Sequence, residues 1–224
     1  MKDHRNTLKN ILCCGALALA ALLTSGCATG RRIVDVPLPD VPVPANVAQR
    51  GTAVIMTRDV RVFEKDPRQP SIPSAAGNLN MLSDTTKNNL IGRQRNTYGA
   101  ALGEVALQPG GSVQDRTSAL IAKELTARGY TVVADPAQAG TKLDVSVEEF
   151  WGWITPGMWT LSIEARIRCQ IKLSRAGKEA VITASGYAIH HPQTGSQANW
   201  EKGYRLAYEN FLQDLRSKLN SAGF

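Results

Sequence analysis

The clearest pattern in the chain is a strict alternation of apolar and polar residues over positions 159–173. The apolar positions include Trp159, Ile163, Cys169 and Leu173, and the residues between them are polar or charged. Successive side chains of a β-strand point to opposite faces of a sheet, so this alternation predicts one long strand with a buried face and a hydrated face. A half-hydrated strand of this kind is typical of an antiparallel sheet.

Two other segments have the period of an amphipathic helix. In residues 112–128, Ser112 can cap the N-terminus, apolar side chains gather on one face, and Gly129 supplies a C-terminal stop. In residues 198–219, apolar and aromatic positions recur at spacings of three and four residues. We expect the apolar stripe of this second helix to lie across the sheet.

Shorter β-rich segments complete the predicted sheet. They cover residues 52–63, 104–108, 130–134, 143–147 and 180–190. Residues 64–96 are polar and interrupted by prolines, which predicts a long loop. The order of these elements predicts an α+β fold: a two-layer domain with an antiparallel-rich mixed sheet and helices on one of its faces.

The N-terminus has the layout of a secretory signal peptide. Lys2, Arg5 and Lys9 give a basic start, residues 11–23 are an uncharged apolar run, and small residues lead to Cys27. An apolar run of 13 residues is shorter than the roughly 20 that a membrane-spanning helix needs. The segment therefore predicts a cleaved leader rather than a permanent span.

The sequence LLTSGCA around Cys27 resembles the lipobox of bacterial lipoproteins, with Gly26 and Cys27 at matching positions and Thr24 where leucine is commonest. This resemblance implies that a diacylglyceryl group is attached to the Cys27 thiol and that residues 1–26 are removed as a lipoprotein signal peptide. Two or three acyl chains give stable anchoring where one does not. Ala28, in place of the aspartate that favours inner-membrane retention, implies sorting to the outer membrane. An ordinary signal peptide with an incidental Cys27 is the alternative.

Residues 27–50 form a predicted tether. They contain the run VPLPDVPVP, and closely spaced prolines favour an extended polyproline II segment. At about 3.1 Å per residue, some 20 residues could hold a domain on the order of 60 Å from its lipid. The alternative is that part of this segment packs on the domain. We expect residues 51–224 to form a single α+β periplasmic domain behind this lipidated, Pro-rich tether.

Composition excludes several classes of protein. The chain has 224 residues, of which 43% are hydrophobic and 20% charged. These values are close to those of a soluble globular domain and exclude wholesale disorder, a collagen-like chain and a polytopic membrane protein. Cys13 and Cys14 leave with the leader and Cys27 carries lipid, so Cys169 is the one thiol left in the mature chain. No intramolecular disulfide is therefore expected, even in an oxidising periplasm.

The net charge of +7 favours anionic partners. Arg93, Arg95, Arg116 and Arg128 could form a basic patch for lipid headgroups, lipopolysaccharide phosphates or anionic glycan, and a solvated surface is the alternative. Nucleic acid does not fit an exported, lipid-anchored chain.

Two further stretches resemble the YajG-type bacterial lipoproteins. The segment LIGRQRNTYG, at residues 90–99, is similar to an "IG…(K/R)N…YG" segment of that family. The segment DRTSALIAKELTARGYTVV, at residues 115–133, is similar to the family's helix-then-strand segment. The resemblance implies an outer-membrane lipoprotein with no assigned catalytic residues. The segment WGWITPGMW, at residues 151–159, departs from the family pattern.

Three tryptophans crowd one predicted turn. Trp151 and Trp153 are the candidate contact with a partner, because tryptophan offers a large contact area at low entropic cost. Packing in the core or across the hairpin is the alternative. Trp159 alternates in line with Leu161 and is expected to be buried.

The remaining reactive side chains suggest no catalytic site. Cys169 falls on the apolar face of its strand and is expected to be buried and unreactive. His190 and His191 are adjacent, as are Glu148 and Glu149, so each pair is expected to diverge on a strand. The sequence contains neither a nucleotide-binding glycine motif nor a common zinc motif. It predicts no catalytic residue, no cofactor and no metal site.

The leading hypothesis is a non-enzymatic lipoprotein that is anchored in outer-membrane lipid through acylated Cys27 and faces the periplasm. Its domain would bind or scaffold an envelope component, with peptidoglycan, lipopolysaccharide and an envelope protein as the partners considered. Two alternatives stay open: a lipoprotein subunit of a secretion or transport assembly, and a cell-wall hydrolase or transferase.

Overall fold

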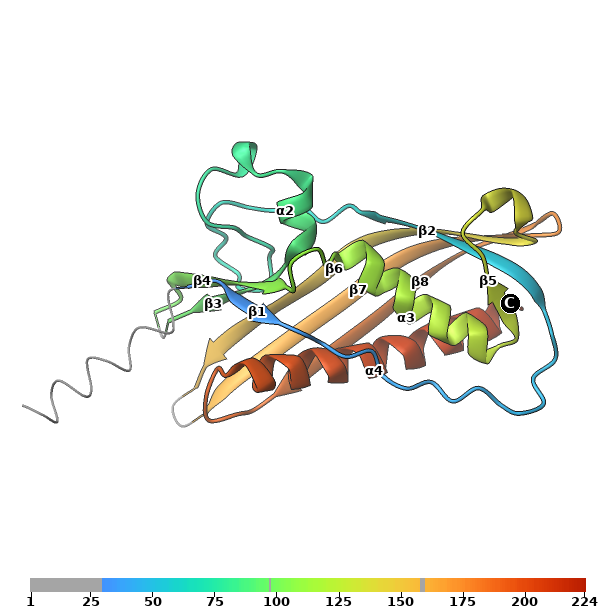
Figure 1. The fold of residues 1–224 in the computed structure, drawn as a ribbon. Coiled ribbons are helices and arrows are strands. Elements are labelled where there is room, and N and C mark those ends of the chain that lie inside the picture. Colours follow the sequence, from blue (N-terminus) through green and yellow to red (C-terminus); the bar gives the residue numbers. More distant parts are fainter. Residues whose placement is uncertain (1–29, 97, 158–159) are drawn as a thin grey trace, which may run out of the picture. The chain divides into compact units, whose positions relative to one another are not determined.

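The computed structural model describes residues 30–96, 98–157 and 160–224. Residues 31–224 form one compact unit (Figure 1). The strands of its sheet are β1 (Arg32–Val34), β2 (Gly51–Asp59), β3 (Leu90–Arg95), β4 (Ala101–Leu107), β5 (Tyr130–Val132), β6 (Thr141–Pro156), β7 (Leu161–Arg175) and β8 (Lys178–His190). The helices are α2 (Asp84–Asn89), α3 (Val113–Ala127) and α4 (Gln197–Ser221), with short 3-10 turns η2 (Leu79–Met81) and η3 (Pro136–Gln138).

Strand β6 is the centre of the sheet, and the sheet forks beside it. On one side β6 pairs antiparallel with β7, which pairs antiparallel with β8. On the other side, residues 141–147 of β6 pair in parallel with β2, and residues 152–153 pair in parallel with β3. Strand β2 leads on to β5, while β3 leads on to β4 and β1. The fork therefore lies between residues 147 and 152 of β6, after the last residue paired with β2 and before the first residue paired with β3.

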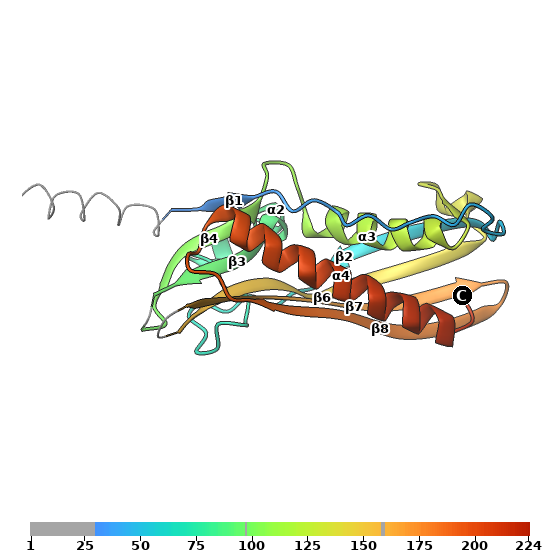
Figure 2. The ribbon, with the colours of Figure 1, turned by 90° about the horizontal axis from the view of Figure 1, so that it is seen from below.

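Helices α3 and α4 cover one face of this sheet (Figure 2). Helix α3 packs on β2 and β5, and α4 packs on β7 and β8. The α+β prediction, with a mixed sheet and these helices on one face, is confirmed. Ser112 caps α3 as predicted, since its Oγ accepts a hydrogen bond from the backbone N–H of Asp115 (3.0 Å). No helix among the described residues is both long enough and apolar enough to cross a membrane.

Helix α4 approaches the sheet closely because glycine occupies the contact. A Cβ atom on Gly186 of β8 would lie 2.5 Å from the backbone nitrogen of Phe211, and one on Gly152 of β6 would lie 2.9 Å from the Tyr204 hydroxyl. The aromatic face of α4 fills the space that these glycines leave. Its Trp200, Tyr204, Tyr208 and Phe211 are fully buried, and the Tyr204 ring stacks on Phe150 at 5.7 Å.

A β-bulge reverses the alternation within β6. Val147 pairs with Cys169 but Glu149 pairs with Arg168, so Glu148 is the extra residue. Before the bulge the odd-numbered side chains face the helices, and after it Phe150 and the other even-numbered side chains do. The expected divergence of Glu148 and Glu149 is therefore wrong. Both carboxylates lie on the face away from the helices, where they pair with β7 arginines.

The Pro-rich segment is not a free spacer from residue 31 onward. Residues 32–34 pair with β4, and Val34 and Val36 are fully buried in the core. Arg116 of α3 donates to the Val36 carbonyl (3.1 Å), while the Asp35 backbone N–H donates to Glu201 of α4 (3.1 Å). The segment runs along both helices (Figure 2). The compact unit thus begins at Arg31, not at residue 51 as predicted from the prolines.

The predicted loop at residues 64–96 contains regular structure. Its second half forms η2, α2 and β3. Helix α2 has six residues, and β3 carries three polar residues in a row and two register shifts, so neither has a readable apolar period. The first half is irregular and covers the sheet face opposite α3 and α4.

Candidate functional site

We call residues 60–83 the irregular cover. Trp151 and Trp153 lie beneath it rather than at an exposed tip. Their relative exposures are 1% and 4%. They form, with Ala75, Leu90 and Ala106, a second apolar cluster on the face away from α4, which we call the tryptophan cluster. The prediction of an exposed aromatic contact is therefore wrong for both side chains. Trp159 and Cys27 lie outside the described residues.

The tryptophan cluster holds residues 60–83 against the sheet. The indole nitrogen of Trp151 donates to the Pro70 carbonyl (3.2 Å), and its ring meets Phe63 edge to face at 5.8 Å. Leu79 and Leu82 pack on the same cluster. The two tryptophans therefore support this segment from beneath and are not part of its exposed surface.

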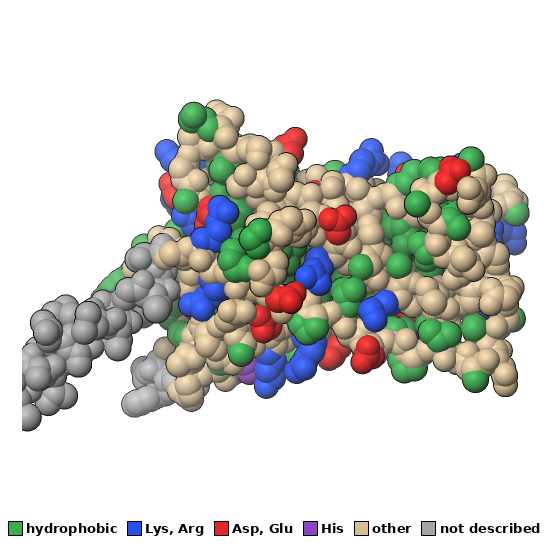
Figure 3. Space-filling model, in the orientation of Figure 1, with side chains coloured by type: hydrophobic (Ala, Val, Ile, Leu, Met, Phe, Trp, Pro, Cys, Tyr) green, Lys and Arg blue, Asp and Glu red, His purple; other side chains and the backbone are tan. Residues whose placement is uncertain are grey.

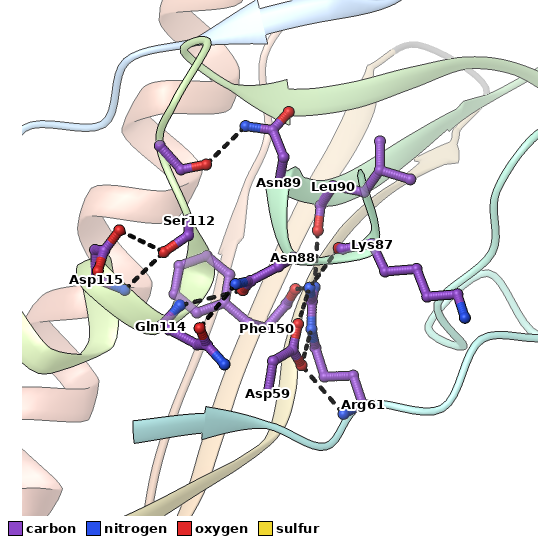
Figure 4. A network of polar contacts seen from close by, with 11 residues as sticks. Asp59, Arg61, Lys87, Asn88, Asn89, Leu90, Ser112, Gln114, Asp115 and Phe150 are labelled. Carbon is purple, nitrogen blue, oxygen red and sulfur yellow. Dashed lines mark hydrogen bonds and ion pairs between the residues drawn. The ribbon is translucent and has the colours of Figure 1, made fainter. Parts of the chain in front are cut away.

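Arg61, near the start of this segment, lies in the fork of the sheet. Its guanidinium donates to the carbonyls of Phe150 (2.7 Å), Leu90 (2.8 Å) and Lys87 (2.8 Å), and it pairs with both carboxylate oxygens of Asp59. These carbonyls come from β6, β3 and α2, so one side chain joins the elements around the fork (Figure 4). The Arg61 side chain is fully buried and its nitrogens are satisfied by this set of partners.

A cavity of about 650 Å³ opens next to Arg61, and we call it the fork cavity. Residues from α2, from the loop before α3 and from β2 line it. They are Arg31, Asp59, Arg61, Phe63, residues 83–89, residues 109–112 and Gln114. Hydroxyl, amide and charged groups predominate in this set, with Phe63 as its aromatic member. Such a lining suits a hydrated polar ligand rather than an acyl chain.

Side-chain amides hold the walls of the fork cavity in place (Figure 4). The Asn89 amide donates to the carbonyls of Leu107 (3.2 Å), Gln108 (3.2 Å) and Gly111 (2.8 Å), which ties α2 to the loop before α3. The Asn88 amide donates to the side chain of Gln114 (3.0 Å). A ligand would therefore meet a largely preorganised wall, which lowers the entropic cost of binding.

The carboxylates at this cavity are mostly engaged. Both oxygens of Asp59 are bonded to Arg61, and Asp115, next to the lining residue Gln114 in the chain, accepts a hydrogen bond from Ser112 (2.6 Å). Two-carboxylate hydrolysis needs one carboxyl group that can donate a proton and a second that can act as base or nucleophile. Asp84 is the lining carboxylate that remains for such a role.

On the face of β6 and β7 away from the helices, acidic and basic side chains pair with one another. Glu148 pairs with Arg168 (3.0 Å) and Glu149 with Arg166 (3.6 Å). Acidic and basic side chains are also interspersed over the helix-covered face (Figure 3). The predicted basic patch is divided: Arg116 of α3 pairs with Asp35, Arg128 at the end of α3 pairs with Glu124, and Arg93 and Arg95 lie on β3.

The remaining reactive groups are placed as structural residues. Cys169 is fully buried, as predicted, and this burial raises the pKa of its thiol well above the usual range. His190 contacts Asn199 (3.2 Å) and His191 contacts Ser162 (3.0 Å), so the two rings have different neighbours. Within the described parts of the chain, no group of three His, Cys, Asp or Glu residues could hold a metal ion.

No protein-family model matches this chain. No curated protein matches it either. Among solved structures, it is similar to a Xanthomonas campestris protein of family DUF330, with 12% identity, a TM-score of 0.47, and coverage of 86% of this chain and 95% of that one.

Two further solved structures show a weaker likeness. A hypothetical protein from Chlamydia trachomatis has 12% identity and a TM-score of 0.39, with 79% and 98% of the two chains covered. A protein described as a neuraminyllactose-binding hemagglutinin homolog from Helicobacter pylori has 10% identity and a TM-score of 0.41, with 82% and 92% covered.

Proposed function

We propose that this chain is a lipid-anchored, non-enzymatic lipoprotein of the outer membrane, whose domain faces the periplasm and binds a polar envelope component. The observation that carries the proposal is the sequence of residues 1–27: a basic start, a short apolar run and a lipobox ending at Cys27. The similarity of residues 90–99 and 115–133 to YajG-type lipoproteins supports it.

The packing of the Pro-rich segment sharpens this proposal. Arg31, where the compact unit begins, is the fourth residue after Cys27. An extended chain spans about 3.5 Å per residue, so these four residues reach at most about 14 Å. A domain attached to an acylated Cys27 would therefore stand next to the membrane, not on the order of 60 Å away.

The fork cavity is the place where we propose that the envelope component binds. Its hydroxyl and amide groups match a ligand rich in hydrogen-bonding groups, such as the glycan or peptide of peptidoglycan. A binding role fits the cavity better than hydrolysis, because Asp59 is held by Arg61 through both oxygens. Asp84 is left without a second free carboxylate among the lining residues.

The anchor is tested by changing Cys27. Cys27→Ser removes the thiol that carries the lipid, so the variant should leave the outer-membrane fraction. Intact-mass measurement of the wild-type protein should show a mature chain that starts with acylated Cys27. A mature, unlipidated protein that starts at another residue would contradict the proposal.

The binding role is tested with purified peptidoglycan, by cosedimentation and by a turnover assay on the same material. Thr85 is exposed on the wall of the fork cavity, so Thr85→Trp should fill the cavity and weaken cosedimentation. Thr131→Trp adds the same ring on exposed β5 and serves as the matched control. Turnover of peptidoglycan would contradict the non-enzymatic role, and a stable co-purifying protein complex would favour a subunit of a transport assembly.

A further inference from the structure

Arg93 is a buried arginine that makes no ion pair with another residue of the described chain. It lies on β3 and is 7% exposed, and its Nε has no hydrogen-bond partner within the described residues. None of the ion pairs in that part of the chain includes it. Removing a charged group from water is unfavourable unless a partner compensates, so the buried, unpaired Nε of Arg93 and the lack of an ion pair to it in the described residues indicate a missing partner.

The carboxylate closest in register to Arg93 is already used. Glu104 is its cross-strand neighbour on β4. One Glu104 oxygen accepts two bonds from Arg31 (2.7 and 3.0 Å), and the other accepts the backbone N–H of Ala76 (3.0 Å). Glu104 therefore fixes the N-terminal segment and the irregular cover, and it makes no ion pair with Arg93.

Arg95 adds a second positive charge beside Arg93. Burial, and then the neighbouring charge of Arg93, lower the pKa of Arg95, while Asp66 acts in the opposite direction. The Nε of Arg95 is also buried without a partner in the described residues, although its Nη1 donates to the Gly99 carbonyl (2.9 Å). The two guanidinium groups thus repel each other, and a bound anion would relieve that repulsion.

Arg93 lines a cavity of about 480 Å³, which we call the arginine cavity. The other lining residues are Lys65, Asp66, Ala75, Gly77 and Asn78. Lys65 and Asp66 are both exposed at its mouth. The one lining carboxylate, Asp66, opposes an anion, whereas Lys65 and Arg93 attract one.

We propose that the arginine cavity binds a phosphate-bearing anion at Arg93. The planar guanidinium presents paired N–H donors that match two phosphate oxygens, and Lys65 adds a flexible point charge. Asn78 has a side-chain amide on the same wall, where its oxygen already accepts the Asn80 N–H (3.1 Å). Phosphate of this kind has two sources, a lipid headgroup and a soluble phosphate compound.

The position of the arginine cavity makes a headgroup accessible if the chain is anchored as proposed. Arg31, four residues after Cys27, bonds the cross-strand neighbour of Arg93. The reach of about 14 Å from Cys27 thus applies to this end of the sheet. The headgroup source rests on the proposed lipid anchor, whereas the phosphate site itself does not.

The site is tested on the full chain purified in neutral detergent, by thermal unfolding with added sodium phosphate against sodium chloride of equal ionic strength. Phosphate should raise the Tm of the wild type by mass action. Arg93→Gln should weaken phosphate binding by about tenfold or more, as expected for loss of a charge-assisted hydrogen bond. Arg205→Gln removes the same charge from the exposed side of α4 and should leave the response unchanged.

Two exposed variants keep the test valid even if Arg93→Gln does not fold. Lys65→Gln should weaken phosphate binding and Asp66→Asn should strengthen it, because they remove opposite charges from the mouth of the arginine cavity.

A second arm compares vesicles of phosphatidylcholine with vesicles that contain phosphatidylglycerol. A Tm rise with inorganic phosphate and no response to either kind of vesicle assigns a soluble source. A Lys65-dependent response to phosphatidylglycerol vesicles but not to phosphatidylcholine vesicles assigns the headgroup. No response in either arm, or equal losses in Lys65→Gln and Arg205→Gln, would overturn the proposal while leaving the Cys27 anchor untouched.

Discussion

The two faces of strand β6 are covered in different ways. On one face, Phe150, Gly152 and Ile154 contact the long helix α4 or the core that it covers. On the other face, Trp151 and Trp153 lie under residues 60–83, a segment with little regular structure. Neighbouring residues of one strand are thus equally buried, but a regular helix covers one set and an irregular segment covers the other. Burial alone therefore does not tell which of them supports the whole domain.

The difference lies in how each cover is held. Helix α4 has 25 residues, satisfies its own backbone internally and presents an aromatic stripe to the sheet. Residues 60–83 depend on individual contacts, such as Trp151 to Pro70 and a short bridge between Glu64 and Ser74. A cover of this kind can open locally at less cost than the global unfolding free energy.

The largest effect is expected from truncating the helix-covered core. Trp200 of α4 is fully buried, and its ring touches the glycines where β3 meets β6. Trp200→Ala should lower the free energy of unfolding by roughly 3–5 kcal/mol, because the surrounding strands cannot collapse into the space. Chemical denaturation followed by circular dichroism measures this loss. A loss below about 1 kcal/mol would mean that α4 is not the principal cover.

A smaller and more local effect is expected from the same substitution under the irregular cover. Trp151→Ala should cost roughly 1–3 kcal/mol, because residues 60–83 can relax into the vacated space. Limited proteolysis should show faster cleavage within residues 60–83 while the rest of the domain stays protected. Met81→Ala, at an 82% exposed position of the same segment, is the matched control and should change neither measurement. Uniform loss of protection would contradict a locally held cover.

The helix-covered face could be predicted from sequence because its pattern is periodic. The alternation in residues 159–173 and the helical spacing in 198–219 correspond to β7 and α4 within two residues at each end. The opposite face could not be predicted, because the bulge at Glu148 reverses the direction of Trp151. Two adjacent glutamates in an apolar strand are the signal that was available, since an unbroken strand would have buried one of them.

The candidate site was even less predictable. Arg61 binds carbonyls of residues 87, 90 and 150, so its role depends on contacts between segments far apart in the chain. The sequence predicts Arg93 only as part of a surface patch, because nothing in the local sequence indicates that Glu104 is bound to Arg31. The prolines of residues 37–44 suggested an extended segment, but not the hydrophobic contacts that Val34 and Val36 make with the core.

An effect of intermediate size is expected at the free edge of the sheet. Strand β8 pairs with β7 alone in the described sheet, and residues 180–189 carry no charge, which is a risk for edge-to-edge association. Helix α4 covers part of this edge: Asp214 accepts the Ser185 backbone N–H (2.8 Å), and Asn210 donates to the Tyr187 carbonyl (2.7 Å). Asp214→Ala should cost about 1 kcal/mol and promote self-association.

Sedimentation velocity over a range of protein concentrations measures this self-association. Asp214→Asn keeps an acceptor oxygen and is the matched control, so it should sediment as the wild type does. If Asp214→Ala also sediments unchanged at every concentration, the contact with Ser185 does not protect the edge.

The smallest effect is expected on the open face, at Tyr187. Its hydroxyl donates to Glu164, and burial together with this hydrogen bond raises the pKa of Tyr187 from 10.0 to about 12. The folded state therefore holds the proton more tightly than the unfolded state, so the contribution to stability is complete below pH 10 and is lost as the pH rises toward 12. Tyr187→Phe removes this contribution and should cost less than about 1 kcal/mol at neutral pH, because the residue is 41% exposed and its hydrogen bond is open to water. The difference in unfolding free energy between wild type and variant should shrink between pH 10 and pH 12, and the tyrosinate absorbance of the variant should lack one late-titrating group.

Tyr98 is 95% exposed and provides the control, because Tyr98→Phe should leave the late-titrating group in place. A difference that stays constant over this pH range would show that the Tyr187 hydroxyl does not make the hydrogen bond to Glu164 in solution.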